Sequence, residues 1–217
     1  MLPKLTAALT GATLAACSVV GVREAEEPAF SVIARVGAVE VRQYAPRIAA
    51  ETSVGGGEME ARSAGFRRLA GYIFGSNRSR AKIAMTAPVA QAPVVQAPVV
   101  QSGESIAMTA PVAQARDGSG QWLIRFFMPA KYTMETLPQP LDPAVRLVPV
   151  PGETMAVLRF SGSTAPEAVK ARGRELLRTL QGSAWQPTGT AVAWFYDPPW
   201  TLPPFRRNEV AAPVTRR

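Results

Sequence analysis

The side chains that most often carry chemistry in proteins are scarce in this 217-residue chain. It has no histidine, which removes the commonest general base and every Ser–His or Cys–His catalytic pair. Its single cysteine, Cys17, cannot form an internal disulfide or a cysteine-rich metal cluster. Glu209 stands in the run RRNEV, where we expect a carboxylate beside arginines to form a fixed ion pair rather than act as an acid or base. These residues favour a binding protein over an enzyme.

The surroundings of Cys17 indicate export. Lys4 is followed by an uncharged segment, 5–16, which ends in small residues and is too short to span a bilayer comfortably. The sequence LAAC at 14–17 resembles the bacterial lipobox, in which the cysteine is lipidated. We therefore expect a lipoprotein signal peptide at 1–16, lipidation at Cys17 and a flexible tether at 17–30. An ordinary secretory signal with a chance cysteine is the alternative.

The residue after the cysteine bears on localisation. Ser18 is not the aspartate that is associated with retention in the inner membrane. In a Gram-negative host, the resemblance to lipoproteins therefore implies a protein of the cell envelope. We expect it to be lipid-anchored in the outer membrane and to face the periplasm.

The net charge of +8 raises the question of an anionic partner. The arginines occur as single residues and pairs, whereas a nucleic-acid-binding face usually gathers its basic residues. We therefore predict solvated surface charge and no nucleic-acid partner.

Periodicity predicts an α+β fold. Alternation of apolar and polar residues predicts a strand at 39–44, and apolar runs predict further strands at 48–52, 122–128, 145–150, 155–160, 190–196 and 206–210. Helical spacing predicts a helix at 58–74. A second helix is expected to begin at a Thr164 capping box, to bury Leu177 among other leucines and to end at Gly182. Two similar halves, each with one helix and antiparallel strands, follow from this order.

A literal repeat interrupts the first half. The sequence IAMTAPVAQ occurs at 83–91 and again at 106–114, and APVVQ occurs twice between them. Because closely spaced prolines oppose a ladder strand, we predict an exposed proline-rich loop at 92–101 with a strand-like copy on each side. In the repeat, Thr86 and Thr109 are expected to bond nearby backbone, and Met85 and Met108 to pack inward.

Five motifs together resemble the SOUL family of haem-binding proteins. They occur in family order: KIAMTAPV at 82–89, RFFMP at 125–129, AVLRFSG at 156–162, YDPPW at 196–200 and RRNEV at 206–210. The resemblance covers about 31–214 and implies a distorted antiparallel β-barrel of two pseudo-symmetric halves. It extends to gyrase-inhibitor-like effector-binding domains, which hold small hydrophobic molecules.

The resemblance implies that haem or another tetrapyrrole, or another hydrophobic small molecule, binds in an apolar groove along the first helix. Arg62 or Arg67 would pair with the propionates, since a guanidinium matches the geometry of a carboxylate. The alternative is that the same apolar residues simply pack on the sheet. The groove would use Phe66, Leu69, Ala70 and Ile73, with Tyr196 and Pro198 from the YDPP loop.

Without histidine, any iron ligation must be of a non-histidine kind. Tyr72 or Met59 lies in the right region of the chain, and weak or absent ligation is the other expectation. Two different functions stay open: a hydrolase of small hydrophobic compounds with a buried glutamate as base, and a structural envelope lipoprotein without a ligand cleft.

Overall fold

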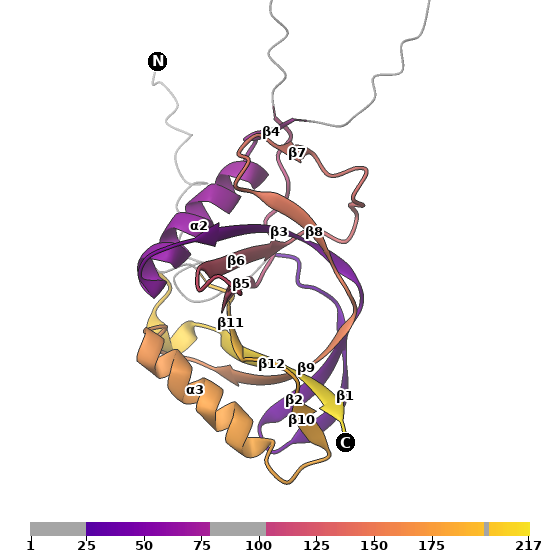
Figure 1. Cartoon of the computed structure of the whole chain (residues 1–217), viewed down its shortest axis with the longest axis vertical. Coiled ribbons are helices and arrows are strands. Elements are labelled where there is room, and N and C mark those ends of the chain that lie inside the picture. The colour runs from indigo at the N-terminus through magenta and orange to yellow at the C-terminus, as the bar shows by residue number, and fades with distance from the viewer. Residues whose placement is uncertain (1–24, 79–102, 198–199) are drawn as a thin grey trace, which may run out of the picture.

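The computed structural model of the chain describes residues 25–78, 103–197 and 200–217. In these ranges a 10-stranded sheet curves strongly, and helices α2 and α3 lie on its convex face (Figure 1). The signal peptide, Cys17, the first repeat copy and the proline-rich loop at 92–101 lie outside the described residues. No helix within the described residues is long and apolar enough to cross a membrane.

The first half of the chain supplies strands β1 to β7 and one helix. They are β1 (Phe30–Val36), β2 (Val39–Tyr44), β3 (Arg47–Val54), α2 (Glu58–Ile73), β4 (Asn77–Arg78), β5 (Val112–Arg116), β6 (Trp122–Phe127) and β7 (Gln139–Pro140). The second half follows with β8 (Arg146–Val150), β9 (Glu153–Phe160), α3 (Pro166–Thr179), β10 (Trp185–Pro187), β11 (Val192–Phe195), η1 (Pro203–Phe205) and β12 (Asn208–Arg216).

Strand pairing gives the sheet a two-fold pattern. The order is β1-β2-β9-β12-β11-β5-β6-β3-β8, with β10 paired to β12 outside this path. The two halves correspond strand by strand: β2 to β8, β3 to β9, β5 to β11 and β6 to β12. Exchanging corresponding strands leaves the pairings among these eight strands unchanged, and the pair β5–β11 lies at the centre. The predicted α+β fold of two similar halves is thus confirmed. The edge strands β1 and β8 are not paired with each other in the described ranges.

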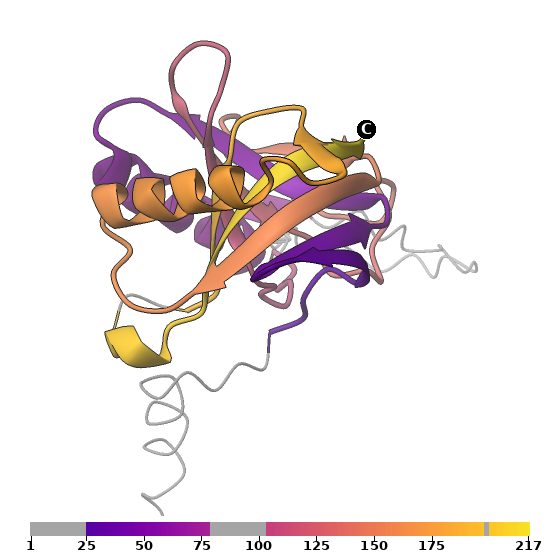
Figure 2. The same cartoon turned by 90° about the horizontal axis from the view of Figure 1, so that it is seen from below.

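Each helix packs where its apolar stripe meets the sheet. Leu69, Tyr72 and Ile73 of α2 are buried against β3 and β6, and Leu176 of α3 is buried against β9 and β12. Gly65 allows α2 to lie close to β6, since a Cβ at this position would stand 2.4 Å from Cγ1 of Ile124. Figure 2 shows α3 crossing the convex side of the second half.

The start of α3 differs from the prediction. Ala165, not Thr164, is the N-cap, and it makes no side-chain capping hydrogen bond. Pro166 occupies the first helical turn, where its fixed φ suits the helix and its missing N–H costs nothing. The capping box is therefore wrong, and so is burial of Leu177, which is 38% exposed.

The second repeat copy is only partly a strand, because β5 begins at Val112. Thr109 donates a hydrogen bond to the carbonyl of Phe127, as predicted for the threonine of this motif. The inward packing of Met108 is wrong, since this side chain is 39% exposed.

The N-terminal boundary also differs. Strand β1 was not predicted, and residues just before it already contact the domain. The carbonyl of Glu26 accepts a hydrogen bond from the amide of Ala110 at 2.9 Å, and Glu27 forms an ion pair with Arg207 at 2.7 Å. The last residues of the predicted tether are thus fixed to the sheet.

Candidate functional site

The apolar residues predicted on the first helix divide into two groups. Leu69 and Ile73 are 0% and 1% exposed and belong to the core cluster between α2 and the sheet. Phe66 is 37% exposed, Arg67 is exposed and Ala70 is half-buried. The core-packing alternative therefore describes Leu69 and Ile73, and the accessible part of the predicted groove is the face with Phe66 and Ala70.

The end of β11 approaches this helix at Arg62. The guanidinium of Arg62 lies over the ring of Phe195, 4.5 Å from its centroid, and Arg206 is near enough to act on its pKa. Pro198 lies outside the described residues. The large exposed apolar side chains of α2 and of the segment after β11 are Met59 and Phe66 of α2 and Trp200, Leu202 and Phe205 of the segment. We call these five residues with Arg62 the α2–loop surface.

Arg62 is the cation of this surface. Burial lowers its pKa, Glu58 opposes this effect and Arg206 adds to it. Arg68 pairs with Asp142 at 3.2 Å, whereas neither Arg62 nor Arg67 has a carboxylate partner within the described ranges. The terminal nitrogens of Arg62 donate long hydrogen bonds to the carbonyl of Thr164, at 3.4 and 3.5 Å, which a carboxylate ligand would replace with charge-assisted ones.

Tyr196 lies elsewhere, on the concave side of the sheet. Its hydroxyl donates a hydrogen bond to Oε2 of Glu209 at 2.6 Å. Burial raises the pKa of Tyr196, and the charge of Glu209 raises it further. Phe195, not Tyr196, is therefore the residue of this strand that contacts the cation of the α2–loop surface.

Glu209 forms the predicted fixed ion pair, in a larger network than expected. Its carboxylate is 0% exposed and accepts two hydrogen bonds from Arg42, at 3.0 and 3.2 Å, and two from Arg207, at 3.0 and 3.2 Å. Burial alone would lower the pKa of Arg42, but the charge and hydrogen bonds of Glu209 raise it above its usual value. Sequence reasoning missed Arg42, because alternation along β2 assigned the polar positions to solvent.

The two suggested iron ligands differ in access. Tyr72 is 1% exposed and donates a hydrogen bond to the carbonyl of Pro138 at 2.9 Å, so it is a core residue that cannot reach a surface ligand. Met59 is 47% exposed and its sulfur lies 2.7 Å from Nη2 of Arg62. The described ranges contain no group of three or more His, Cys, Asp or Glu residues that could hold a metal ion.

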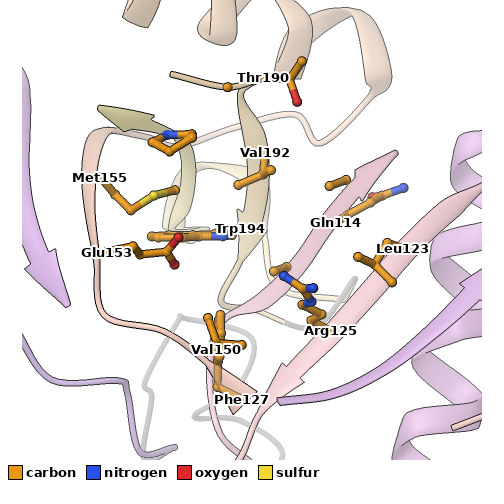
Figure 3. Close-up of a pocket in the computed structure, with 14 residues that line it drawn as sticks. Gln114, Leu123, Arg125, Phe127, Val150, Glu153, Met155, Thr190, Val192 and Trp194 are labelled. Atoms are coloured by element: carbon orange, nitrogen blue, oxygen red, sulfur yellow. The ribbon is translucent and has the colours of Figure 1, made fainter. Parts of the chain in front are cut away.

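A pocket of about 260 Å³ opens on the concave face, which the sequence did not predict (Figure 3). It lies at the junction of the two halves, between β5 and β6 on one side and β9 and β11 on the other. Trp194 and Met155 give it an apolar wall, and Arg125 and Glu153 bring opposite charges to it.

Comparison with known families agrees with the motif order. The model of the SOUL heme-binding protein family matches residues 25–101 and 95–213. The chain belongs to the SOUL heme-binding family. No curated protein matches the chain. Membership supports haem or tetrapyrrole binding as the general activity of this SOUL protein.

Solved structures show a shared fold. The C-terminal domain of EcmrR has a TM-score of 0.56 and 8% identity, over 82% of this chain and 98% of that chain. EcmrR in a DNA complex has a TM-score of 0.55 and 8% identity, over 82% of this chain but only 57% of that chain. A hydrolase from Listeria innocua has a TM-score of 0.49 and 12% identity, over 84% of this chain and 94% of that chain. At such identities the likeness concerns the fold alone.

Proposed function

We propose that this SOUL protein binds haem or a related tetrapyrrole on the α2–loop surface. The observation that carries the proposal is a half-buried guanidinium without a carboxylate partner in the described ranges, Arg62, which lies on α2 one turn from the exposed ring of Phe66. Exposed apolar residues that cluster beside polar ones commonly mark a binding site. Family membership supports the class of ligand.

Binding would rest on two contributions. The flat macrocycle removes apolar surface from water, which is favourable at about 25 cal/mol per Å². The guanidinium of Arg62 would hold a propionate through charge-assisted hydrogen bonds, because its planar donors match a carboxylate. The Soret band of the porphyrin ring reports binding, and Met59 is the side chain of this surface that could approach the iron.

A hydrolase that uses Glu209 as base fits the geometry less well. Arg42, Arg207 and Tyr196 together donate five hydrogen bonds to this carboxylate, and the side chain has no exposure to solvent. A base must reach the proton that it abstracts. The network therefore favours a fixed structural anion, and binding is the better-supported function.

Arg62→Gln is expected to weaken hemin binding about fivefold to tenfold, since a hydrogen bond to a charged group contributes about 1.5–3 kcal/mol and part of this is lost to solvent screening. Titrations of the soluble domain, residues 25–217, followed at the Soret band would measure the change. Arg174→Gln removes the same charge from an exposed position on α3 and serves as the matched control.

A metal-free porphyrin with the same propionates should bind nearly as well and should respond to Arg62→Gln in the same way. Equal affinities of wild type, Arg62→Gln and Arg174→Gln for hemin would contradict the assignment of the site. A much weaker metal-free porphyrin would reveal an iron ligand outside this description.

We also propose that the chain is anchored to the cell envelope by lipid on Cys17, in the outer membrane and facing the periplasm; the LAAC sequence supports this. In an exporting Gram-negative host, Cys17→Ser is expected to move the protein from the membrane fraction to the soluble fraction. Radiolabelled palmitate should label the wild type and not the variant. Absence of label from the wild type would contradict lipidation.

A further inference from the structure

The concave pocket is separate from the α2–loop surface, because the two open on opposite faces of the sheet. Inward-facing side chains of β6, β9 and β11 line it, and Figure 3 shows Arg125, Glu153, Met155 and Trp194 converging on the space between these strands. Its volume of about 260 Å³ lies below the roughly 300–1,000 Å³ of sites that hold drug-sized ligands. A ligand of this pocket is therefore smaller than a tetrapyrrole.

The wall of the pocket suits a flat ring. Trp194 is 3% exposed and meets the ring of Tyr44 edge-on, with centroids 5.6 Å apart at 88°. Phe127 and Met155 are also buried beside it, at 4% and 3% exposure. These side chains are held by the core, so their apolar surface is in place before a ligand arrives. Half-buried Leu123 and Val192 also line the pocket.

One of the two charges in the pocket is balanced by a partner. Glu153 forms an ion pair with Arg47. Arg47 is itself held between two rings, 4.8 Å from the centroid of Tyr44 and 4.5 Å from that of Phe127. A negative and a positive charge thus cancel on this side of the pocket.

The charge on the other side is not balanced. Glu51, whose side chain is 7% exposed, is shared by two arginines: Nε of Arg125 at 2.8 Å and Nη2 of Arg146 at 3.0 Å. The terminal amino groups of Arg125 have no hydrogen-bond partner within the described ranges, and its side chain is 36% exposed. Arg125, Glu51 and Arg146 together carry one excess positive charge, and Arg125 is the member of this group that lines the pocket.

We propose that this pocket binds a small aromatic carboxylate, with its ring against Trp194 and Met155 and its carboxylate on the guanidinium of Arg125. The two terminal amino groups form the donor fork that a carboxylate accepts. The site is independent of haem binding, both in position and in the residues that form it.

Three probes that share one ring test the charge: 2-naphthoate, 2-naphthamide and 2-naphthylmethylammonium, titrated calorimetrically into residues 25–217. The naphthoate is expected to bind at least tenfold more tightly than the amide, and Arg125→Gln to remove this preference. Arg174→Gln, which removes a positive charge from an exposed position on α3, is the matched control and should change the naphthoate affinity less than threefold.

Val192→Trp is a second variant that fills the pocket while leaving the ion pairs intact, so it tests the site even if Arg125→Gln is poorly folded. It should abolish naphthoate binding and leave circular dichroism and hemin affinity unchanged. Tighter binding of the ammonium probe, saturable binding of none of the three, or unchanged binding by folded Val192→Trp would each overturn the proposal. Arg62→Gln should not affect naphthoate, so failure here and failure of the haem proposal are distinguishable.

Discussion

Glu209→Gln is expected to lower the free energy of unfolding by about 3 kcal/mol, because it removes the buried counter-charge of Arg42 and leaves this arginine only its ion pair with the partly exposed Glu40. The side chain of Arg42 is 5% exposed, and its two hydrogen bonds to Glu209 tie β2 to β12 across β9. Arg207 contributes less to the loss of stability, since it keeps its ion pair with Glu27 and its side chain is 15% exposed. The loss comes mainly from uncompensated charge rather than from packing, since glutamine has nearly the same volume.

Urea denaturation followed by circular dichroism measures this loss. Glu167→Gln is the matched control, because Glu167 forms an ion pair with Lys170 at 2.8 Å on the surface of α3, and we expect no measurable change there. Arg42→Gln should destabilise by a similar amount, and the double variant by clearly less than the sum. Equal midpoints for Glu209→Gln and Glu167→Gln would contradict the importance of the network.

The ion pairs around Glu209 form a row of alternating charges, which compensates the burial of its central members. Arg35, Glu40, Arg42, Glu209, Arg207 and Glu27 follow one another as ion pairs of alternating sign, with contacts of 2.7–3.0 Å. The outer members are partly exposed, whereas the central Glu209 is fully buried. Each buried charge therefore has two opposite neighbours, and the hydration lost on burial is replaced along the row.

Periodicity predicted most of the elements. The stripe Leu69, Tyr72 and Ile73 has the spacing of a helix that packs on a sheet, and α2 covers 58–73 as expected. Alternation likewise predicted β2, and an apolar run predicted the core of β9. Strand β1 was missed although Phe30, Val32, Ala34 and Val36 have the spacing of a strand, and its side chains are mostly exposed.

The concave face could not be predicted in this way. Alternation assumes that the polar side of a strand faces water, but Glu40 and Arg42 of β2, and Arg125 of β6, face a curved interior or pocket where charges pair with other strands. Their partners lie far away in sequence: Arg42 and Glu209 are 167 residues apart. Only the register of the sheet brings them together, and the pocket depends on the same register.

The ligand groove could not be predicted fully either. Helical spacing identifies the apolar face of α2, but it does not show which residues of that face remain accessible to a ligand. The core and the predicted groove were assigned from the same periodicity, which cannot tell a side chain beneath the helix from one beside it. In the structure, Leu69 is fully buried, and Phe66, one turn away, is 37% exposed and contacts the ring of Phe126 from outside, with centroids 5.4 Å apart. Stability and ligand affinity should therefore respond differently at these two positions.

Leu69→Ala is expected to cost about 2–5 kcal/mol of unfolding free energy, since it leaves a cavity between α2 and the sheet. The variant should bind hemin with unchanged affinity wherever it remains folded. Phe66→Ala should cost clearly less stability, because its ring keeps contact with water in the native state, yet it should weaken hemin binding several-fold by removing apolar contact from the α2–loop surface. Urea midpoints and Soret titrations of both variants, performed below the unfolding transition, separate the two effects. Weaker hemin binding by folded Leu69→Ala with no change in Phe66→Ala would place the ligand beneath the helix, and the α2–loop surface would then be the wrong site.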